Sequence, residues 1–559
     1  MLKIETWLEG IGLKQPIEEC PAWPPDLYAL TGALIRRSGG YLELFRGRSA
    51  DYLSGVVPVA NRWREKIDEI QVETVTVQDL QSVRVSEVIE GWAVLMGARK
   101  TLISEIRLSR ELSQCLIRLA LIADEASAGI GIGIERETGG GGIQRSKFLA
   151  IADAVLYGKG LQSFCWDVPQ DTLCVLGKQH TPSKGATFRS LSHHLALYHP
   201  NEIEARWINP FPMTGRTPSK RTLNLLLLPW PTRVDAEDFR YLPAGHTRTD
   251  ESAPPGYFRY EPKSNQTDVS FEERLNRAIS MALRHTGTID AIVFPELSLT
   301  EKDYYIAERI AFQSRSILVC GLRQAGATPE DWDANLSVLQ AAGAFRGPEE
   351  PPNFDDPLLS GLRFAQPKHH RWFLDRSQLV TYQLGGYFSE LQGCWEHIDL
   401  PPRTLNFVTL NGMTWTVLVC EDLARQDPAA DLIRAVGPNL LIALLMDGPQ
   451  LSGRWPARYA SVLADDPGSS VLTLTSLGMA QRSRPILQSG KREPPSTVIA
   501  LWRDAVHGEV QIALDLEDDA CVLSLESQMR TEYCADGRDD GGQTLYPVFA
   551  GYRSFRTKA

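Results

Sequence analysis

The first residue that could carry chemistry is a cysteine at the end of an apolar segment. Residues 414–419 are rich in Val, Leu, Trp and Thr, which predicts a buried strand, and Cys420 follows directly. In α/β folds, side chains at the carboxyl end of a strand project into a crevice. A sharp turn after Cys420, through Glu421 and Asp422, would present backbone N–H groups to a developing oxyanion. The alternative is a buried structural cysteine, because free cysteines are among the most buried residues.

Two further residues would make this thiol a nucleophile. Glu296 follows the apolar segment 289–294 and a proline, and Lys368 lies in a Gln-Pro-Lys-His-His segment. The thiol needs a base, and a glutamate at a neighbouring strand end can take its proton and later return it to a leaving amine. A lysine ammonium would stabilise both the thiolate and the tetrahedral oxyanion. Taken singly, Glu296 is better explained as a surface carboxylate and Lys368 as a solvated cation.

Length, charge and cysteine content indicate what kind of protein carries these residues. A chain of 559 residues exceeds what one core usually holds, so we expect at least two domains. The net charge of 58 − 69 = −11 argues against nucleic acid or an anionic membrane as the main partner. Nine cysteines without a Cys-x-x-Cys pair, and no signal peptide, predict free thiols in a reducing cytoplasm. No run approaches about 18 apolar residues, so we expect no transmembrane helix and a cytoplasmic protein.

Residues 1–208 are predicted to form a mainly α-helical N-terminal domain. Its apolar residues recur at helical spacing in four segments: 26–38, 60–72, 78–98 and 101–127. Nothing in its composition indicates chemistry. We therefore interpret it as an interaction or assembly module that binds a protein partner.

Two features of this N-terminal part invite a functional interpretation. The Gly-rich residues 128–142 lack the Gly-Lys-Ser/Thr of a phosphate-binding loop, so we interpret them as a connector. His193, His194 and His199 lie close together, but no cysteine is near and Glu202 and Glu204 are the only adjacent carboxylates. We predict no metal site there.

The remainder of the chain alternates between strands and helices. Residues 209–221 are rich in proline and basic residues, which predicts a linker. The alternation then runs through residues 222–527, followed by a Gly- and Asp-rich, then aromatic, tail over residues 528–559. This order favours an α/β domain in which helices cover a sheet. The tail could pack on a neighbouring protomer, on the N-terminal domain or within its own domain.

Three short motifs in this second domain resemble the carbon–nitrogen hydrolase (nitrilase) superfamily. Residues 292–296, Ile-Val-Phe-Pro-Glu, resemble its glutamate motif, and Lys368–His370 resembles its lysine motif. Residues 417–422, Val-Leu-Val-Cys-Glu-Asp, are similar to its cysteine motif, and the resemblance covers roughly residues 221–527. The glutamate-to-lysine separation, 368 − 296 = 72 residues, is longer than usual for the family, and the acidic, Pro-rich insert at residues 347–356 accounts for it.

The resemblance implies a fold, a mechanism and a set of partners. It implies a four-layer αββα sandwich, protomers that pair into a homo-oligomer, a Glu296–Lys368–Cys420 triad, and no metal or organic cofactor. Many members carry a second glutamate soon after the lysine; here Asp375 replaces it, or no residue does. Arg458 resembles a late landmark of the family and, with Glu421, is expected near the substrate.

The function implied is hydrolysis of a non-peptide carbon–nitrogen bond, in an amide or nitrile of a small molecule, through a thioester on Cys420. The alternative is a regulatory or scaffolding protein, such as a stress or defence component, that assembles through its helical domain and carries the second domain as an output or a relic. An intact triad favours the enzyme. The sequence does not identify the substrate.

Overall fold

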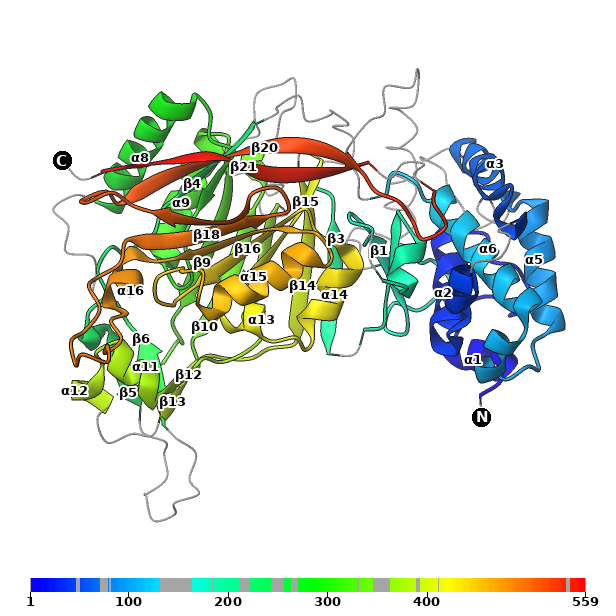
Figure 1. The fold of residues 1–559 in the computed structure, drawn as a ribbon, viewed down its shortest axis with the longest axis horizontal. Coiled ribbons are helices and arrows are strands. Elements are labelled where there is room, and N and C mark those ends of the chain that lie inside the picture. The colour runs from blue at the N-terminus through cyan, green and yellow to red at the C-terminus, as the bar shows by residue number, and fades with distance from the viewer. Residues whose placement is uncertain are drawn as a thin grey trace, which may run out of the picture.

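A computed structural model shows two stacked β-sheets at one end of the molecule and a group of helices at the other (Figure 1). It describes residues 2–46, 51–70, 79, 82–130, 163–182, 185–200, 202–210, 222–242, 256–262, 270–328, 331–344, 362–388, 393–410, 412–538 and 543–557. The Gly-rich connector, most of the 209–221 linker and the 347–356 insert lie outside these residues.

The first large sheet carries the predicted glutamate motif. Its path runs β11 (Arg363–Pro367), β10 (Ala334–Gln340), β9 (Ile317–Gln324), β7 (Ala291–Val293), β4 (Thr222–Leu227), β20 (Ala520–Thr531) and β21 (Gln543–Phe555), and β8 (Leu299–Thr300) also pairs with β9. The central strands β4, β7 and β9 are parallel. Their carboxyl ends therefore meet at one edge, where the loop after β7 begins.

The second large sheet carries the predicted cysteine motif. Its order is β19 (Gly508–Ala513), β18 (Val498–Asp504), β17 (Ser470–Thr475), β16 (Leu440–Leu445), β15 (Met413–Val419), β14 (Arg403–Leu410) and β3 (Ile203–Ile208). Strands β15, β16 and β17 are parallel and fully buried, which explains their continuous apolar sequence.

Side chains from the facing surfaces of the two sheets form one apolar core. Leu225 and Val293 of the first sheet share this core with Trp415 and Ile442 of the second. Helices α8 (Phe271–Thr286) and α9 (Glu301–Gln313) pack on the outer surface of the first sheet. Helices α13 (Glu421–Ala424), α14 (Ala429–Val436) and α15 (Trp455–Asp465) pack on that of the second (Figure 1). The α/β class is confirmed.

Local sequence signals place several of these elements well. The Ser270 hydroxyl oxygen accepts from the N–H of Glu273, and the Ser270 N–H donates in return to the Glu273 carboxylate, as the capping-box spacing predicts. A cap of this kind contributes about 1 kcal/mol. The predicted strands around residues 411–412 are β14 and β15, and the helix predicted over 455–465 is α15.

A small third sheet lies beside the edge where the two large sheets end. It consists of β12 (Phe373–Asp375), β13 (Gly393–Glu396), β6 (Tyr257–Tyr260) and β5 (Phe239–Leu242). Its apolar side chains pack with residues from α11 (Arg376–Thr381), α12 (Gly385–Phe388) and α16 (Leu477–Arg482). This cluster also includes Leu297, which follows Glu296 directly, and Met446, whose backbone forms a hydrogen bond with Cys420.

Among the described residues of the N-terminal part, the α-helices all lie before residue 130. It contains α1 (Ile4–Ile11), α2 (Pro24–Ser38), α3 (Val56–Asp68), α5 (Ser86–Gly97) and α6 (Arg110–Ala126), with the 3₁₀ turn η4 (Ile103–Leu108) before α6. From residue 163 onward the described residues form β1 (Cys174–Gly177), the 3₁₀ turn η5 (Phe188–Leu191), β2 (Leu195–Tyr198) and β3. The four segments with helical spacing correspond to α2, α3, α5 and η4 with α6.

The two ends of the chain are joined to the sheets more closely than the sequence predicted. Strand β3, placed by the sequence at the end of the N-terminal domain, pairs in parallel with β14 across six residue pairs. One apolar core runs without a break from α2 through β3 to α14 and α15. Pairing between strands distant in sequence leaves no local signal, so the boundary at residue 208 does not match these contacts.

The C-terminal tail is also part of a sheet. Strand β20 crosses the predicted boundary at residues 527–528, and β21 pairs with it along its full length. Beyond β20, Glu532 and Arg538 contact His180 and Glu125 of the N-terminal part. Along the part of the chain described, no helix is both long enough and apolar enough to cross a membrane.

Candidate active site

Cys420 occupies a tight turn between β15 and α13. Its backbone has φ 46° and ψ −106°, an unfavourable conformation for a residue with a Cβ. The Cys420 N–H donates to the carbonyl of Leu444 on β16 (2.9 Å), which fixes the turn to the sheet. The next N–H, that of Glu421, opens the first turn of α13, where amide groups have no partner within the helix. The Glu421 side chain itself pairs with Arg425.

Glu296 lies at the end of β7, where the chain passes very close to β9. A Cβ on Gly321 of β9 would lie 2.5 Å from the Glu296 Cα, so only glycine fits there. The carboxylate is buried, and its Oε1 accepts bonds from Asn335 Nδ2 (2.7 Å) and Lys368 Nζ (2.8 Å). Its Oε2 is buried without a hydrogen-bond partner among the described residues. One oxygen is therefore held in place while the other is open to a proton.

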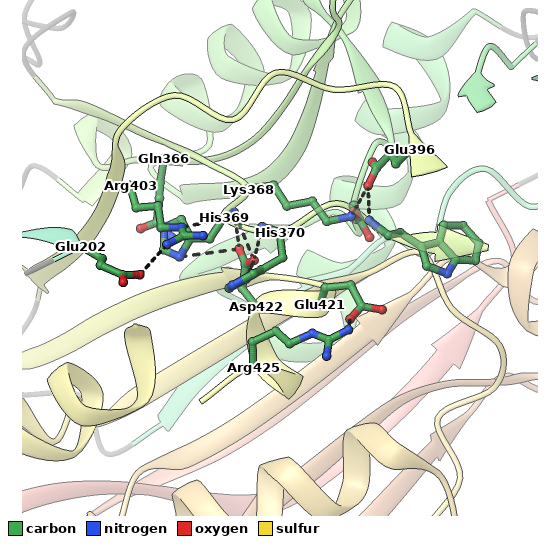
Figure 2. Close-up of polar contacts among 12 residues, drawn as sticks. Glu202, Gln366, Lys368, His369, His370, Glu396, Arg403, Glu421, Asp422 and Arg425 are labelled. Atoms are coloured by element: carbon green, nitrogen blue, oxygen red, sulfur yellow. Dashed lines mark hydrogen bonds and ion pairs between the residues drawn. The ribbon is translucent and has the colours of Figure 1, made fainter. Parts of the chain in front are cut away.

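Lys368 is held between two carboxylates. Its Nζ donates to Glu296 Oε1 and, at 2.6 Å, to Oε2 of Glu396 on β13 (Figure 2). Asn335 links the two acids, since its Nδ2 also donates to Glu396 Oε1 (2.9 Å). The backbone N–H of Trp372 donates to Glu396 Oε2 (3.0 Å). All four polar groups are at least nine-tenths buried, so their charges interact strongly.

Asp422 fixes the lysine segment against the cysteine turn. Its carboxylate accepts the backbone N–H groups of His369 and His370 at 3.0–3.1 Å, as Figure 2 shows. Gln366 adds a second link, donating to the carbonyl of Val417 on β15 (3.0 Å). These bonds join the edge strand of one sheet to the central strand of the other. The second acid of the cysteine motif therefore positions the lysine segment.

The electrostatics of the site favour a neutral thiol at rest. Burial raises the pKa of Cys420 well above its ordinary value, and Glu296 raises it further while Lys368 opposes both. Burial also raises the pKa of Glu296, with Lys368 opposing and Glu396 adding to the effect. Burial alone would lower the pKa of Lys368, but Glu296, Glu396 and Cys420 together hold it well above its usual value. As expected, Lys368 favours the thiolate and Glu296 opposes it; burial and Glu296 together outweigh Lys368, so Glu296 is suited to take the proton.

Two of the residues predicted to bind substrate do not reach this centre. Asp375 is exposed and caps α11, its Oδ1 accepting from the N–H of Gln378 (2.7 Å). Glu396 holds the lysine instead, 28 residues after it (396 − 368) on a different strand of the small sheet. Arg458 is exposed on the outer side of α15, and its one hydrogen bond among the described residues goes to the carbonyl of Gly453 (3.5 Å).

A second buried polar group, which interacts electrostatically with Cys420, was missed by sequence reasoning. The Tyr382 hydroxyl donates to Asp447 Oδ1 (2.5 Å), and Arg454 donates to the same oxygen (2.7 Å). Burial and Asp447 raise the pKa of Tyr382 well above its ordinary value, and Cys420 adds a smaller contribution in the same direction. The only sequence signal was Met446–Asp447 at the end of an apolar strand next to β15.

No family model matches the sequence, and no curated protein matches it. Among solved structures, an amidase from Nesterenkonia sp. is 10% identical over 54% of this chain and 90% of its own, with a TM-score of 0.31. Nit3 of Saccharomyces cerevisiae, a member of branch 10 of the nitrilase superfamily, is 11% identical over 56% and 92%, with a TM-score of 0.31. These neighbours cover about half of the chain, and at such identities and TM-scores the likeness identifies neither a family nor an activity.

Proposed function

We propose that this protein hydrolyses a carbon–nitrogen bond of a small amide or nitrile through a covalent intermediate on Cys420. The observation that supports this most directly is the arrangement of Glu296, Lys368 and Glu396, a buried cation between two carboxylates, beside a thiol on a strained turn. Clusters of buried, strongly coupled ionisable groups next to a nucleophile are typical of catalytic sites. A purely structural role does not explain the group well. Burying three charges to hold two strands together is unfavourable compared with apolar packing.

In the proposed reaction with an amide, the Cys420 sulfur attacks the carbonyl carbon while Glu296 takes the thiol proton. Lys368 and the Glu421 N–H stabilise the tetrahedral oxyanion. Glu296 then gives the proton to the leaving nitrogen, and the carbon–nitrogen bond breaks. Water, deprotonated by Glu296, attacks the thioester and releases the carboxylic acid and the free thiol. Glu396 acts as a positioning residue that keeps Lys368 oriented and protonated.

The architecture in the proposal is the four-layer αββα sandwich of the nitrilase superfamily, built from residues 222–527 together with β3 and β21. Two sheets with helices on both outer surfaces support it. Assembly into a homo-oligomer, a protein partner for the N-terminal part and a cytoplasmic location also remain proposals.

Trapping the intermediate tests the reaction. The protein would be incubated with butyramide and acrylamide, which neighbours of the amidase type carry in their crystal structures, and the intact mass recorded after rapid quenching. We expect an acyl or Michael adduct on Cys420 that is absent from Cys420→Ser. A matched control is Cys534→Ser, since Cys534 is also buried but lies outside the site. Labelling of other cysteines with Cys420 unmodified would overturn the proposal.

A double-mutant cycle tests the triad without knowledge of the substrate. The rate of Cys420 alkylation by iodoacetamide would be measured in Glu296→Gln, Lys368→Met and the double variant. If the two residues act as a unit around the sulfur, the double variant should be far less impaired than the product of the single effects. Multiplicative effects, or none, would show that they do not control this thiol.

A further inference from the structure

A large cavity lies away from Cys420, between the N-terminal part and α14. Its volume of about 570 Å³ falls in the range of small-molecule sites. One wall comes from α2, η5 and β2, including Tyr28, Phe188 and Leu197. The other comes from the segment that follows the cysteine turn, including Asp431 and Arg434 of α14. A molecule in this cavity would touch both parts of the chain.

The interior of the cavity is positive and its rim is negative. Lys178 is the most buried charged residue of the lining, at 1% exposure. The carboxylates are exposed or nearly so: Asp427 and Asp431 are exposed, and the Asp466 side chain is 42% exposed. Asp466 is moreover occupied by Arg189 in a bidentate pair at 2.7–2.8 Å. The acids at the rim therefore cannot neutralise the cation in the interior.

No carboxylate among the described residues forms an ion pair with Lys178; Asp124 and Glu532 raise its pKa only by longer-range electrostatics, and burial outweighs them. Its Nζ donates to the carbonyl of Ser192 (2.5 Å), to the Ser192 hydroxyl (3.3 Å) and to the carbonyl of Arg189. The hydroxyl of Ser192 also accepts from Tyr28, so the bonds continue into the aromatic wall. Burial lowers the pKa of Lys178 to about 8, which an anion nearby would reverse. Arg36 adds a second cation at the mouth, with no ion pair among the described residues.

We propose that this cavity binds a small anionic molecule with an aromatic or apolar body, its charged group directed inward toward Lys178 and its body against Tyr28 and Phe188. A phosphate or carboxylate group would supply the missing counter-charge for Lys178 and Arg36. The aromatic and aliphatic wall, Tyr28, Phe188, Leu195 and Leu197, would cover the body. This site is independent of the proposed hydrolysis, since none of its lining residues belongs to the catalytic centre.

Titration calorimetry on the full chain tests the proposal, with phenyl phosphate as the anionic probe and benzylamine as a cationic probe of similar size. We expect saturable binding of phenyl phosphate and none of benzylamine. Arg36→Ala should weaken binding by about fivefold, and Asp431→Asn should strengthen it by a similar factor, because each alters one charge at a partly solvated mouth. Both positions are exposed, so these variants should fold. Arg284→Ala, an exposed arginine on α8, is the matched control and should change nothing.

Lys178→Met should abolish binding, and its folding would be checked by circular dichroism. If that variant does not fold, the opposite signs at Arg36 and Asp431 still decide the question. Inorganic phosphate as a third probe separates the two parts of the site, and weaker binding than phenyl phosphate is expected. Absence of phenyl phosphate binding, preference for benzylamine, or equal effects of Arg284→Ala and Arg36→Ala would overturn the proposal.

Discussion

Two buried lysines in this protein are stabilised in opposite ways. Lys368 and Lys178 are exposed by only 2% and 1%. Lys368 donates to two carboxylates, those of Glu296 and Glu396. Lys178 donates to two backbone carbonyls and one hydroxyl. Burial acts alike on both, so the difference between them comes from their partners.

The partners reverse the direction of the pKa shift. Carboxylates hold the pKa of Lys368 well above its usual value, so this lysine is charged at neutral pH. Neutral oxygens do not offset the desolvation of Lys178, and its pKa falls to about 8. A permanently charged lysine suits stabilisation of an oxyanion, whereas an uncompensated one suits attraction of an anion from solution.

The largest effect is expected from removing the base next to Lys368. Glu296→Gln keeps the shape of the side chain but cannot take the thiol proton, so acylation of Cys420 should fall by about 10²–10⁴-fold. The measurement is the pre-steady-state rate of adduct formation by mass spectrometry. Lys178→Met serves as the comparison and should leave that rate within about twofold, since Lys178 lies outside the site. A comparable loss in both variants would mean that Lys178 is not functionally separate from the site of Glu296 and Lys368.

A smaller effect is expected on stability: replacing each lysine should lower the unfolding free energy, by a larger amount at Lys368 than at Lys178. Lys368→Met leaves two buried carboxylates without a counter-charge and should cost about 3–5 kcal/mol of unfolding free energy. Lys178→Met leaves only neutral acceptors unpaired and should cost about 1–3 kcal/mol. Urea unfolding at pH 7, followed by circular dichroism, measures both. Equal losses would show that the partners do not matter.

The pH dependence of stability should distinguish the lysines further. Between about pH 8 and 10.5, folded Lys178 has lost its proton while unfolded Lys178 retains it, because the folded pKa is about 8. The unfolded state then binds more protons, so this lysine makes stability rise with pH, by roughly 3 kcal/mol at most. The difference in unfolding free energy between the wild type and Lys178→Met should therefore rise across this pH range. The corresponding difference for Lys368→Met should not rise, since the pKa of Lys368 lies well above this pH range. If the difference for Lys178→Met did not change with pH, the lowered pKa of Lys178 would be contradicted.

The smallest expected effect is a shift in the acidic limb of the pH profile of the Cys420 alkylation rate. Glu396 raises the pKa of Glu296, so Glu396→Gln should move the acidic limb of Cys420 alkylation to lower pH. Asp375→Asn, at the position expected from the sequence, should leave the limb unchanged, because Asp375 is exposed and caps α11. The measurement is the alkylation rate between pH 4 and 8. If Asp375→Asn shifted the acidic limb, Asp375 would have to belong to the site after all.

The sequence by itself determined the parts of the site that rest on local chemistry. Glu296, Lys368 and Cys420 each end or follow a short segment whose residue types indicate a strand, and the structure brings them together. The α/β alternation and the capping box of α8 were predictable for the same reason, since strand and helix signals act over a few residues.

Only the tertiary structure decided what depends on pairing between distant segments. Glu396 contacts Lys368 because β13 joins a small sheet whose strands come from residues 239–260 and 373–396. Strand β3 pairs with β14 in the second sheet, and β20, followed by β21, pairs with β4 in the first, although β3 and β14, like β20 and β4, lie far apart in the sequence. The cavity around Lys178 likewise requires α2 and α14 to meet. Hydrogen bonds between strands and the burial of charges are set by which segments pack together, and residue types along a chain do not encode that pairing locally.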